Sequence, residues 1–209
     1  MEKIISLFLL ILLTFSVTVA QGDENALAEL QKEFKNINDF RANFIQNSSF
    51  TSQTKSPTLK GKLSYKKDNK FRIELNNSLL VSDGKTLWNF NKKENKVYIN
   101  NLENEYSFFS LKNIILDYPQ KSFIRYLGEE SLNGNTYKII QITPKESELN
   151  FETIKIWYSK NDFIGKVEVI DSGGSKHQFE LTGIKINPKI PNSLFDFVPS
   201  EGSEVIDLR

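Results

Sequence analysis

Residues that could do chemistry are few in this chain of 209 residues. It contains one histidine, His177, and no cysteine, so thiol nucleophiles, cysteine metal ligands and sites built on several histidines are excluded. His177 alternates with Phe179 and Leu181, which places all three on one face of a predicted strand. This pattern favours a packed histidine over a catalytic one. The Gly-Gly-Ser stretch that ends at Ser175 is a predicted hairpin turn and not a nucleophile elbow.

The charged residues offer no better candidates. Glu129 and Glu130 are adjacent, so they point to opposite faces of a strand and are poorly placed for paired acid and base work. Two short lysine pairs, the first of them at Lys66, are weak evidence for phosphate binding. There is no phosphate-binding glycine loop and no metal-ligand spacing. The sequence therefore predicts no enzyme, no cofactor and no metal site, and the formal net charge of +1 gives no support for nucleic-acid binding.

The beginning of the chain has the three-part layout of a secretory signal. A basic residue precedes an apolar run at residues 4–13, and the small residue Ala20 stands before the expected cut. The apolar run is shorter than the roughly 20 residues that a membrane-spanning helix needs. A lipid anchor would require cysteine after the cut, where Gln21 stands. We therefore expect residues 1–20 to be a removed signal peptide and residues 21–209 to form a single domain.

The hydrophobic pattern predicts one helix followed by a long series of strands. From Asp23 apolar residues recur at helical spacing as far as Ile37, and the period changes to two at Phe40. Asp83-Gly84 separates two apolar runs, which predicts a hairpin with a type I′ turn. About ten or eleven strands with short turns imply one antiparallel sheet, which curls toward a barrel at this length. The assigned strands begin at Phe40 and continue at 59–65, 71–75, 79–82, 86–90, 123–129, 137–143, 153–158, 166–170 and 176–184.

One apolar segment interrupts the strands. Ser107 to Tyr118 has helical spacing, starts with a candidate N-cap serine and is followed by Pro119. This helix is too apolar to lie on the surface alone, so we expect it to cover the opening of a concave sheet. The 16 Phe and 7 Tyr could fill an ordinary core or line a dry cavity. Such a cavity suits an acyl chain, because each buried methylene contributes about 0.8 kcal/mol.

Short motifs follow one another along the chain in a characteristic order. They are FRANFIQ at 40–46, Gly61 to Tyr65 followed by Phe71, VSDGKTLW at 81–88, ITPK at 142–145, and FDFVP at 195–199 with Gly202 shortly after. In this order and spacing they resemble the LolA family of periplasmic outer-membrane lipoprotein carriers. The resemblance implies a mainly β fold with α, an unclosed antiparallel β-barrel of about eleven strands with a helical lid over a hydrophobic cavity.

The resemblance also implies a function. LolA proteins take the acyl chains of lipoproteins from an inner-membrane ABC transporter and carry them across the periplasm of a Gram-negative bacterium to the outer membrane, where an acceptor can receive them. We therefore expect a periplasmic monomer that binds lipoproteins. The residues expected to contact the acyl chains are Phe44, Leu63, Phe71, Ile73, Trp88, Phe90, Phe108, Leu111 and Ile115.

One position departs from the family pattern. LolA proteins commonly have Arg-Pro before the third strand, and the arginine holds the lid closed. This chain has Lys67-Asp68 there. Lysine keeps the charge but lacks the planar five-donor fork of arginine. We expect a lid that is latched more loosely through Lys67, or latched by another group.

Three other classes of function fit the sequence less well. A related fold could serve as a regulatory module that senses lipid or lipoprotein, which a membrane anchor or an extra domain would favour. An outer-membrane acceptor is disfavoured because no cysteine is available for lipidation. A hydrolase is least favoured, because no nucleophile and base stand in register.

Overall fold

The strands of this chain join into one long sheet. The computed structural model describes residues 17–50, 58–102, 110–146 and 149–209. Within them twelve strands pair in the order β12-β6-β5-β4-β3-β2-β1-β11-β10-β9-β8-β7. Only β12 runs parallel to its neighbour, β6. The strands are β1 (Asp39–Ser49), β2 (Thr58–Lys66), β3 (Lys70–Leu75), β4 (Ser78–Asp83), β5 (Thr86–Asn91), β6 (Lys96–Asn101), β7 (Ser122–Leu132), β8 (Asn135–Pro144), β9 (Phe151–Ser159), β10 (Phe163–Asp171), β11 (Lys176–Ile186) and β12 (Glu204–Asp207).

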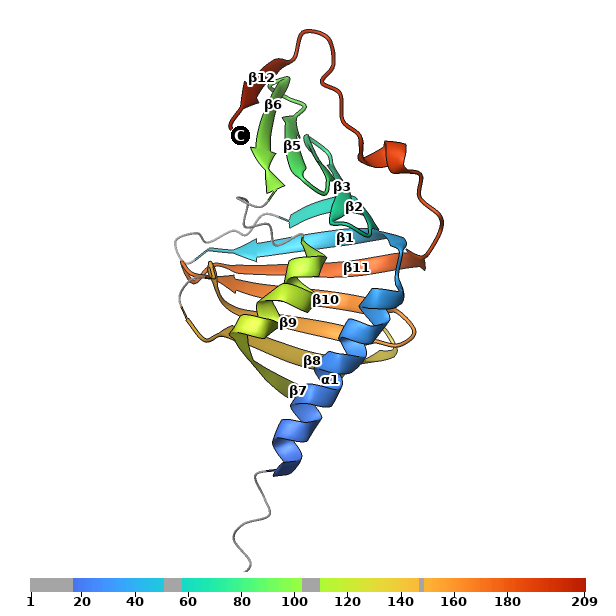
Figure 1. Cartoon of the computed structure of the whole chain (residues 1–209), viewed down its shortest axis with the longest axis vertical. Helices are drawn as coiled ribbons and strands as arrows, with labels where there is room; N and C mark the ends of the chain where they lie inside the picture. The colour runs from blue at the N-terminus through green and yellow to red at the C-terminus, as the bar shows by residue number, and fades with distance from the viewer. Residues whose placement is uncertain (1–16, 51–57, 103–109, 147–148) are drawn as a thin grey trace, which may run out of the picture.

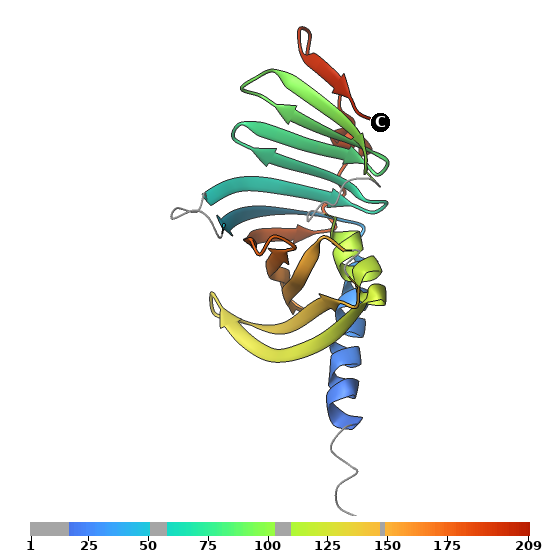
Figure 2. The same ribbon diagram turned by 90° about the vertical axis from the view of Figure 1, so that its left-hand side faces the viewer.

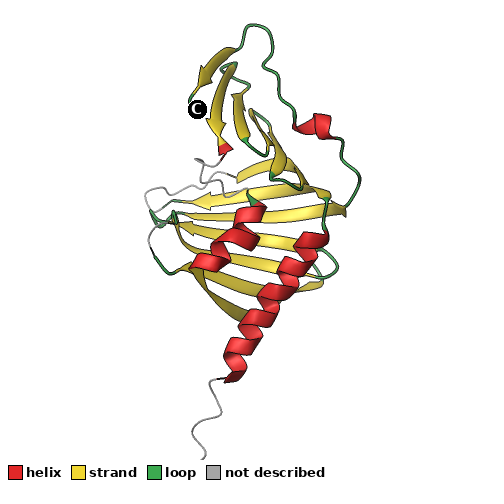
Figure 3. Cartoon of the chain, viewed as in Figure 1, coloured by secondary structure: helices red, strands yellow, loops and turns green. Residues whose placement is uncertain are grey.

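The sheet is curved and its two edge strands, β7 and β12, do not meet (Figure 1). Figure 2 shows β7 and β8 bent into an arc, while β2 to β6 fan out above them. Helix α1 (Val17–Asn36) and a second helical segment at residues 111–121 lie side by side across the half formed by β1 and β7 to β11 (Figure 3). We call the face that they cover the inner face, the opposite one the outer face, and residues 110–121 the lid. The predicted unclosed barrel with a helical lid is confirmed.

The lid contains two short helical elements, η2 (Asn113–Asp117) and η3 (Tyr118–Lys121). The prediction placed this helix at Ser107 to Tyr118, and its first three residues lie outside the described part of the chain. In the described part, Ser110 caps the lid, because its Oγ accepts from the backbone N–H of Asn113 at 3.3 Å. Pro119 is compatible with helix here because it stands at the first turn of η3.

Two strands, β6 and β12, were not among those assigned from the sequence. The expected turn at Asp83-Gly84 also differs in detail. Asp83 ends β4, and Gly84 with Lys85 forms the two-residue turn, in which Gly84 alone has a positive φ of 99°. A Cβ at Gly84 would lie 2.2 Å from the carbonyl oxygen of Asp68. The close approach of the neighbouring β2–β3 turn therefore also requires glycine at position 84. Positive φ at both turn positions, the type I′ pattern, occurs instead at Asp68-Asn69 and at Asn133-Gly134.

Helix α1 packs on the inner face through one apolar stripe. It begins at Val17, before the predicted start at Asp23. Leu30 and Phe34 are buried, and the Phe34 ring lies 5.6 Å from the ring of Tyr65 on β2 and 6.2 Å from that of Phe163 on β10. Each such buried side chain contributes about 1.5–3 kcal/mol. Among the helices that the structure describes, none combines the length and the apolar character needed to cross a membrane.

Polar bonds fix α1 against β7 to β9. Tyr158 donates its hydroxyl to the carbonyl oxygen of Ala26 at 2.8 Å, and Lys138 forms a salt bridge with Glu29. Burial, together with the nearby charge of Glu29, raises the pKa of Tyr158 above its ordinary value. The side chain of Asp23 accepts from the backbone N–H of Tyr126 on edge strand β7.

The outer face of β3 to β6 has a second apolar layer. After β11 the chain crosses this face, forms η4 (Asn192–Phe195) and continues to β12 at the far edge (Figure 1). Ile190 and Phe195 are 2% and 0% exposed. The Phe197 ring lies 6.3 Å from Trp88 and 5.9 Å from Phe90. The sheet is therefore packed by helices on one side and by its own C-terminal segment on the other.

Candidate functional site

An apolar cavity lies between the lid and the inner face. On the sheet side β1, β2, β10 and β11 provide large apolar residues, because the period of two places alternate side chains of each strand on this face. On the lid side Leu111 and Ile114 are 6% and 0% exposed. The lining residues are Phe44, Leu63, Leu111, Ile114, Val167, Phe179 and Leu181.

The cavity is small in the closed arrangement. Its volume is about 40 Å³, whereas pockets that hold drug-sized ligands measure about 300–1,000 Å³. The side chains of the lid take up the space next to the sheet, and Ile115, also in the lid, is fully buried in the same core. A ligand the size of an acyl chain can enter only if the lid moves away from the sheet.

Polar bonds connect the lid to the sheet and to α1. The Ser110 hydroxyl donates to Oδ1 of Asn69, in the β2–β3 turn, at 2.9 Å. Nε2 of Gln31 on α1 donates to the carbonyl oxygen of Ile115 at 3.0 Å. At the far end the Tyr118 ring lies 5.2 Å from that of Phe151. The backbone N–H of Lys145 also donates to the carbonyl oxygen of Lys121 at 3.0 Å. Between these bonds the side chains of Leu111, Ile114 and Ile115 pack into the core.

The backbone of the lid is also irregular. The N–H of Tyr118 bonds to the carbonyl oxygen of Asn113, five residues earlier, as in a π-helix. The next residues form a 3-10 turn. Such segments have poorer hydrogen-bond geometry than an α-helix and often occur at functional sites.

Lys67, the predicted latch, makes no bond to the described residues of the lid. Its side chain is exposed, and its backbone N–H bonds to the carbonyl oxygen of Asn38 at 2.8 Å. Among the described residues the bond from this turn to the lid is therefore made by Asn69 and not by Lys67.

Most of the predicted acyl-contacting residues lie on one side of the sheet. Phe44, Leu63 and Leu111 line the cavity, and Ile115 packs beside it. Phe71 and Ile73 are buried on the inner face, since they pair with Tyr65 and Leu63 of β2, but they do not line the cavity in its closed state. Phe108 lies outside the described residues.

Trp88 and Phe90 lie on the outer face. Trp88 pairs with Val81, and Val81 pairs with Arg72, the residue between Phe71 and Ile73. Cross-strand partners share a face, so Trp88 faces away from the cavity and packs toward Phe197. Phe90, two residues along the same strand, lies on that face too. The prediction that these two residues line the cavity is wrong.

The sequence prediction also missed part of the wall. Val167, Phe179 and Leu181 line the cavity but were not among the predicted contacts. The alternation of Phe179 with Leu181 marks a buried strand face. Their position beside Phe44 follows from the pairing of β1 with β11, which are far apart in the sequence.

The sole histidine belongs to a small polar cluster. Nδ1 of His177 lies 3.1 Å from the Ser48 hydroxyl, and Nε2 lies 3.2 Å from Oδ2 of Asp171. A Ser-His-Asp hydrolase uses the opposite nitrogens, and its serine is exposed to substrate. Ser48 is only 4% exposed and also accepts a bond from Gln46 at 3.1 Å. The cluster therefore lacks the arrangement of a hydrolytic site.

Asp171 shows what this cluster does. Its Oδ1 accepts from the backbone N–H groups of Gly173 and Ser175, at 2.9 and 2.8 Å, and so shapes the β10–β11 turn. Burial opposes ionisation of Asp171, but the bonds from Ser175, His177 and Gly173 prevail and lower the pKa of this carboxyl below its ordinary value. The cluster fixes the ends of β1, β10 and β11.

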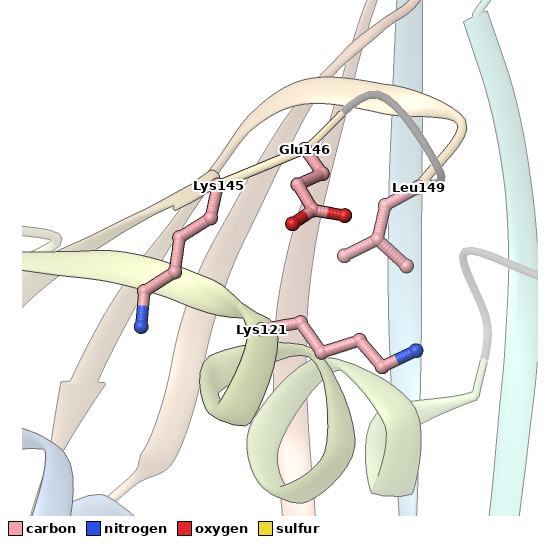
Figure 4. Close-up of a pocket in the computed structure, with 4 residues that line it drawn as sticks. All are labelled: Lys121, Lys145, Glu146 and Leu149. Atoms are coloured by element: carbon pink, nitrogen blue, oxygen red, sulfur yellow. The ribbon is translucent and has the colours of Figure 1, made fainter.

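A recess lies where the end of the lid meets the turn after β8 (Figure 4). It measures about 250 Å³ and is lined by Lys121, Lys145, Glu146 and Leu149. The lining contains two lysines and one glutamate, so positive and negative charges are mixed (Figure 4). This recess lacks the apolar lining of the lid cavity. Across the described ranges no group of three or more His, Asp or Glu residues could hold a metal ion.

The family model and the named relatives that match this chain point to the same family. A model of the family described as "Outer membrane lipoprotein carrier protein LolA" matches residues 35–198. An outer-membrane lipoprotein carrier protein of Francisella tularensis is 27% identical over 210 residues, which cover 99% of this chain and 98% of that protein. An uncharacterized protein of Methanocaldococcus jannaschii is 27% identical over 97% of this chain, and the match spans 59% of that longer protein. The crystal structure of an uncharacterized conserved protein from Thermus thermophilus has the same fold, with a TM-score of 0.60 at 13% identity, covering 90% of this chain and 99% of that one.

Proposed function

This chain belongs to the LolA family, and we propose that it is a carrier that binds the acyl chains of lipoproteins between its inner face and its lid. The observation that supports this most directly is the closed cavity. Leu111, Ile114 and Ile115 of the lid pack where an apolar ligand would lie, and only about 40 Å³ is left over. The lid thus takes the place of the ligand in the empty protein.

The exchange of lid for ligand explains how tight burial remains reversible. Sixteen methylenes at about 0.8 kcal/mol each would contribute about 13 kcal/mol, and three such chains far exceed what any releasable complex uses. Moving three large lid side chains into water costs about 5–9 kcal/mol at about 1.5–3 kcal/mol each. Displacing the lid therefore offsets much of the gain from one acyl chain. One set of apolar contacts replaces another, so transfer needs no ATP at this protein.

The proposed place of action is the periplasm. Residues 1–20 would be removed on export, and the remaining chain would receive lipoproteins from an inner-membrane ABC transporter and pass them to an outer-membrane acceptor where one exists. The relatives named as lipoprotein carriers support this role. Mass spectrometry of the protein isolated from the periplasm tests the first step, because it reports whether the chain begins at Gln21.

Two neighbouring residues provide a matched test of lipoprotein binding. Phe44 lines the cavity, and Ile45 follows it on β1 with its side chain on the other face. We expect Phe44→Ala to reduce the release of a labelled lipoprotein from membrane vesicles that contain the transporter, and Ile45→Ala to leave it unchanged. Circular dichroism of both variants confirms folding.

The outcomes separate a carrier from the other classes. Equal release with Phe44→Ala and with the unaltered protein would contradict the assigned cavity. Lipoprotein that binds but never reaches outer-membrane vesicles would favour a sensing module over a carrier. Co-purification with free phospholipid alone would count against lipoprotein as the cargo.

A further inference from the structure

A groove on the outer face concentrates positive charge. It lies between the central strands β1, β2 and β11 and the C-terminal segment, on the side of the sheet away from the lid. Its volume is about 560 Å³. The side chains that define it are Arg41, Asn43, Lys62, Lys185, Pro188 and Leu194.

The three cations of this groove form no salt bridge within the described residues, although Glu74 stands opposite Lys62 in the register of β2 with β3. The cations Arg41, Lys62 and Lys185 are exposed. The carboxylate that lines the groove, Glu74, is already bound to Arg72 at 2.7 Å. The formal net charge of the whole chain is only +1, so the charge of the groove is a local concentration.

The register makes this arrangement costly to the protein itself. Arg41 on β1 stands directly opposite Lys185 on β11. Like charges in directly opposed positions destabilise a sheet. Where a sequence breaks a local rule without a gain inside the fold, the gain is expected from function. An anionic partner would supply the missing counter-charge.

The spacing of the cations indicates the kind of anion. The Cβ atoms of directly opposed residues such as Arg41 and Lys185 lie roughly 5 Å apart. Those of diagonal neighbours such as Arg41 and Lys62 lie roughly 8 Å apart. Carboxylates two residues apart in an extended chain are separated by roughly 7 Å. An extended segment with several carboxylates matches this spacing and can give each cation its own partner.

The residues that line the groove indicate that its ligand is a segment of a protein. Pro188 and Leu194 offer apolar surface beside the charges, and Asn43 and Ser64 offer polar side chains. A recess with this mixture accepts side chains that a flat lipid surface does not present. We propose that the groove binds an acidic, extended segment of a partner protein, with its carboxylates on Arg41, Lys62 and Lys185. Because the groove and the lid lie on opposite faces, a docked partner leaves the lid able to open. This inference does not depend on what the inner face binds.

A labelled peptide tests the inference. The probe is a fluorescein-labelled ten-residue peptide with four glutamates and two leucines, and its binding is followed by fluorescence anisotropy at low and at physiological salt. The groove variant carries Arg41→Ser, Lys62→Ser and Lys185→Ser. The control variant carries Lys35→Ser, Lys93→Ser and Lys160→Ser, which removes the same charge from exposed sites elsewhere.

We expect the unaltered protein and the control variant to bind the peptide equally and the groove variant to bind it at least about tenfold more weakly. Replacing the glutamates of the peptide by glutamine should abolish binding. Equal affinity of the groove and control variants would overturn the proposal, as would equal binding of the two peptides. Phosphatidylglycerol vesicles and inorganic phosphate are tested alongside. If only these depend on the groove, the ligand is a phosphate group and the proposed protein segment is wrong.

Discussion

Ser110, the first described residue of the lid, donates its hydroxyl to the side-chain oxygen of Asn69, in the β2–β3 turn, at 2.9 Å. The same hydroxyl oxygen accepts from the N–H of Asn113 and caps the lid. Ser110 is only 2% exposed. One side chain thus begins the lid helix and ties it to the sheet.

The first prediction concerns this bond. Asn69 has a φ of 60°, which glycine adopts easily, so Asn69→Gly removes the side chain without backbone strain. Loss of about 1 kcal/mol of hydrogen bonding should raise hydrogen exchange in residues 111–121 about fivefold. Asn133→Gly, at a turn with a φ of 52°, is the matched control. Unchanged lid exchange in Asn69→Gly would show that this bond does not hold the lid.

The second prediction is that opposite walls of the cavity affect binding with opposite sign. Leu111→Ala removes lid packing that competes with the ligand, so the affinity for a fluorescent fatty acid should rise at least about tenfold. Val167→Ala, on the sheet side, removes surface that the ligand would contact and should lower the affinity. Fluorescence titration of both variants measures the change. A loss of affinity in both would mean that the lid is part of the binding surface and does not compete with the ligand.

The third prediction separates the outer face from the cavity. Trp88→Ala should leave fatty-acid affinity unchanged but lower the free energy of unfolding, because Trp88 packs toward Phe197. Urea unfolding of Trp88→Ala, Phe197→Ala and the double variant should give a coupling energy of about 0.5–1.5 kcal/mol. Additive effects of the two changes would show that the rings do not interact.

The fourth prediction is a loss of stability at alkaline pH. Burial and then the charge of Glu29 raise the pKa of Tyr158 in the folded protein, so above about pH 10 the unfolded chain loses a proton that the folded protein keeps. The free energy of unfolding should therefore be undiminished below pH 10 and fall as the pH rises further. Tyr158→Phe should cost about 1 kcal/mol at pH 8 but flatten this fall. Parallel curves of stability against pH for the two proteins would contradict the assignment.

The strands were predictable where the chain folds locally. Alternating apolar residues separated by short turn pairs specify hairpins, and φ is positive at both residues of Asp68-Asn69 and Asn133-Gly134 but only at the glycine of Asp83-Gly84. β12 was missed because it has four residues and pairs in parallel with β6, which depends on the path of the C-terminal segment around the outer face.

Faces and contacts were harder to predict than strands. A period of two shows that Trp88 and Phe90 share a face, but only the register of β4 with β3 decides which face that is. The resemblance to the family pattern pointed to Lys67 as the latch, whereas in the described residues Asn69, two residues later, bonds to Ser110 of the lid.

The open edges of the sheet have a consequence for self-association. A sheet that does not close presents unpaired backbone groups at its last strands, and these can template the addition of a strand from another molecule. Here the carboxylate of Asp23 occupies the N–H of Tyr126 on β7, a bulge follows between Tyr126 and Gly128, and the other edge strand, β12, is only four residues long. These features interrupt both edges. Addition of a strand from a second molecule is therefore disfavoured at both edges.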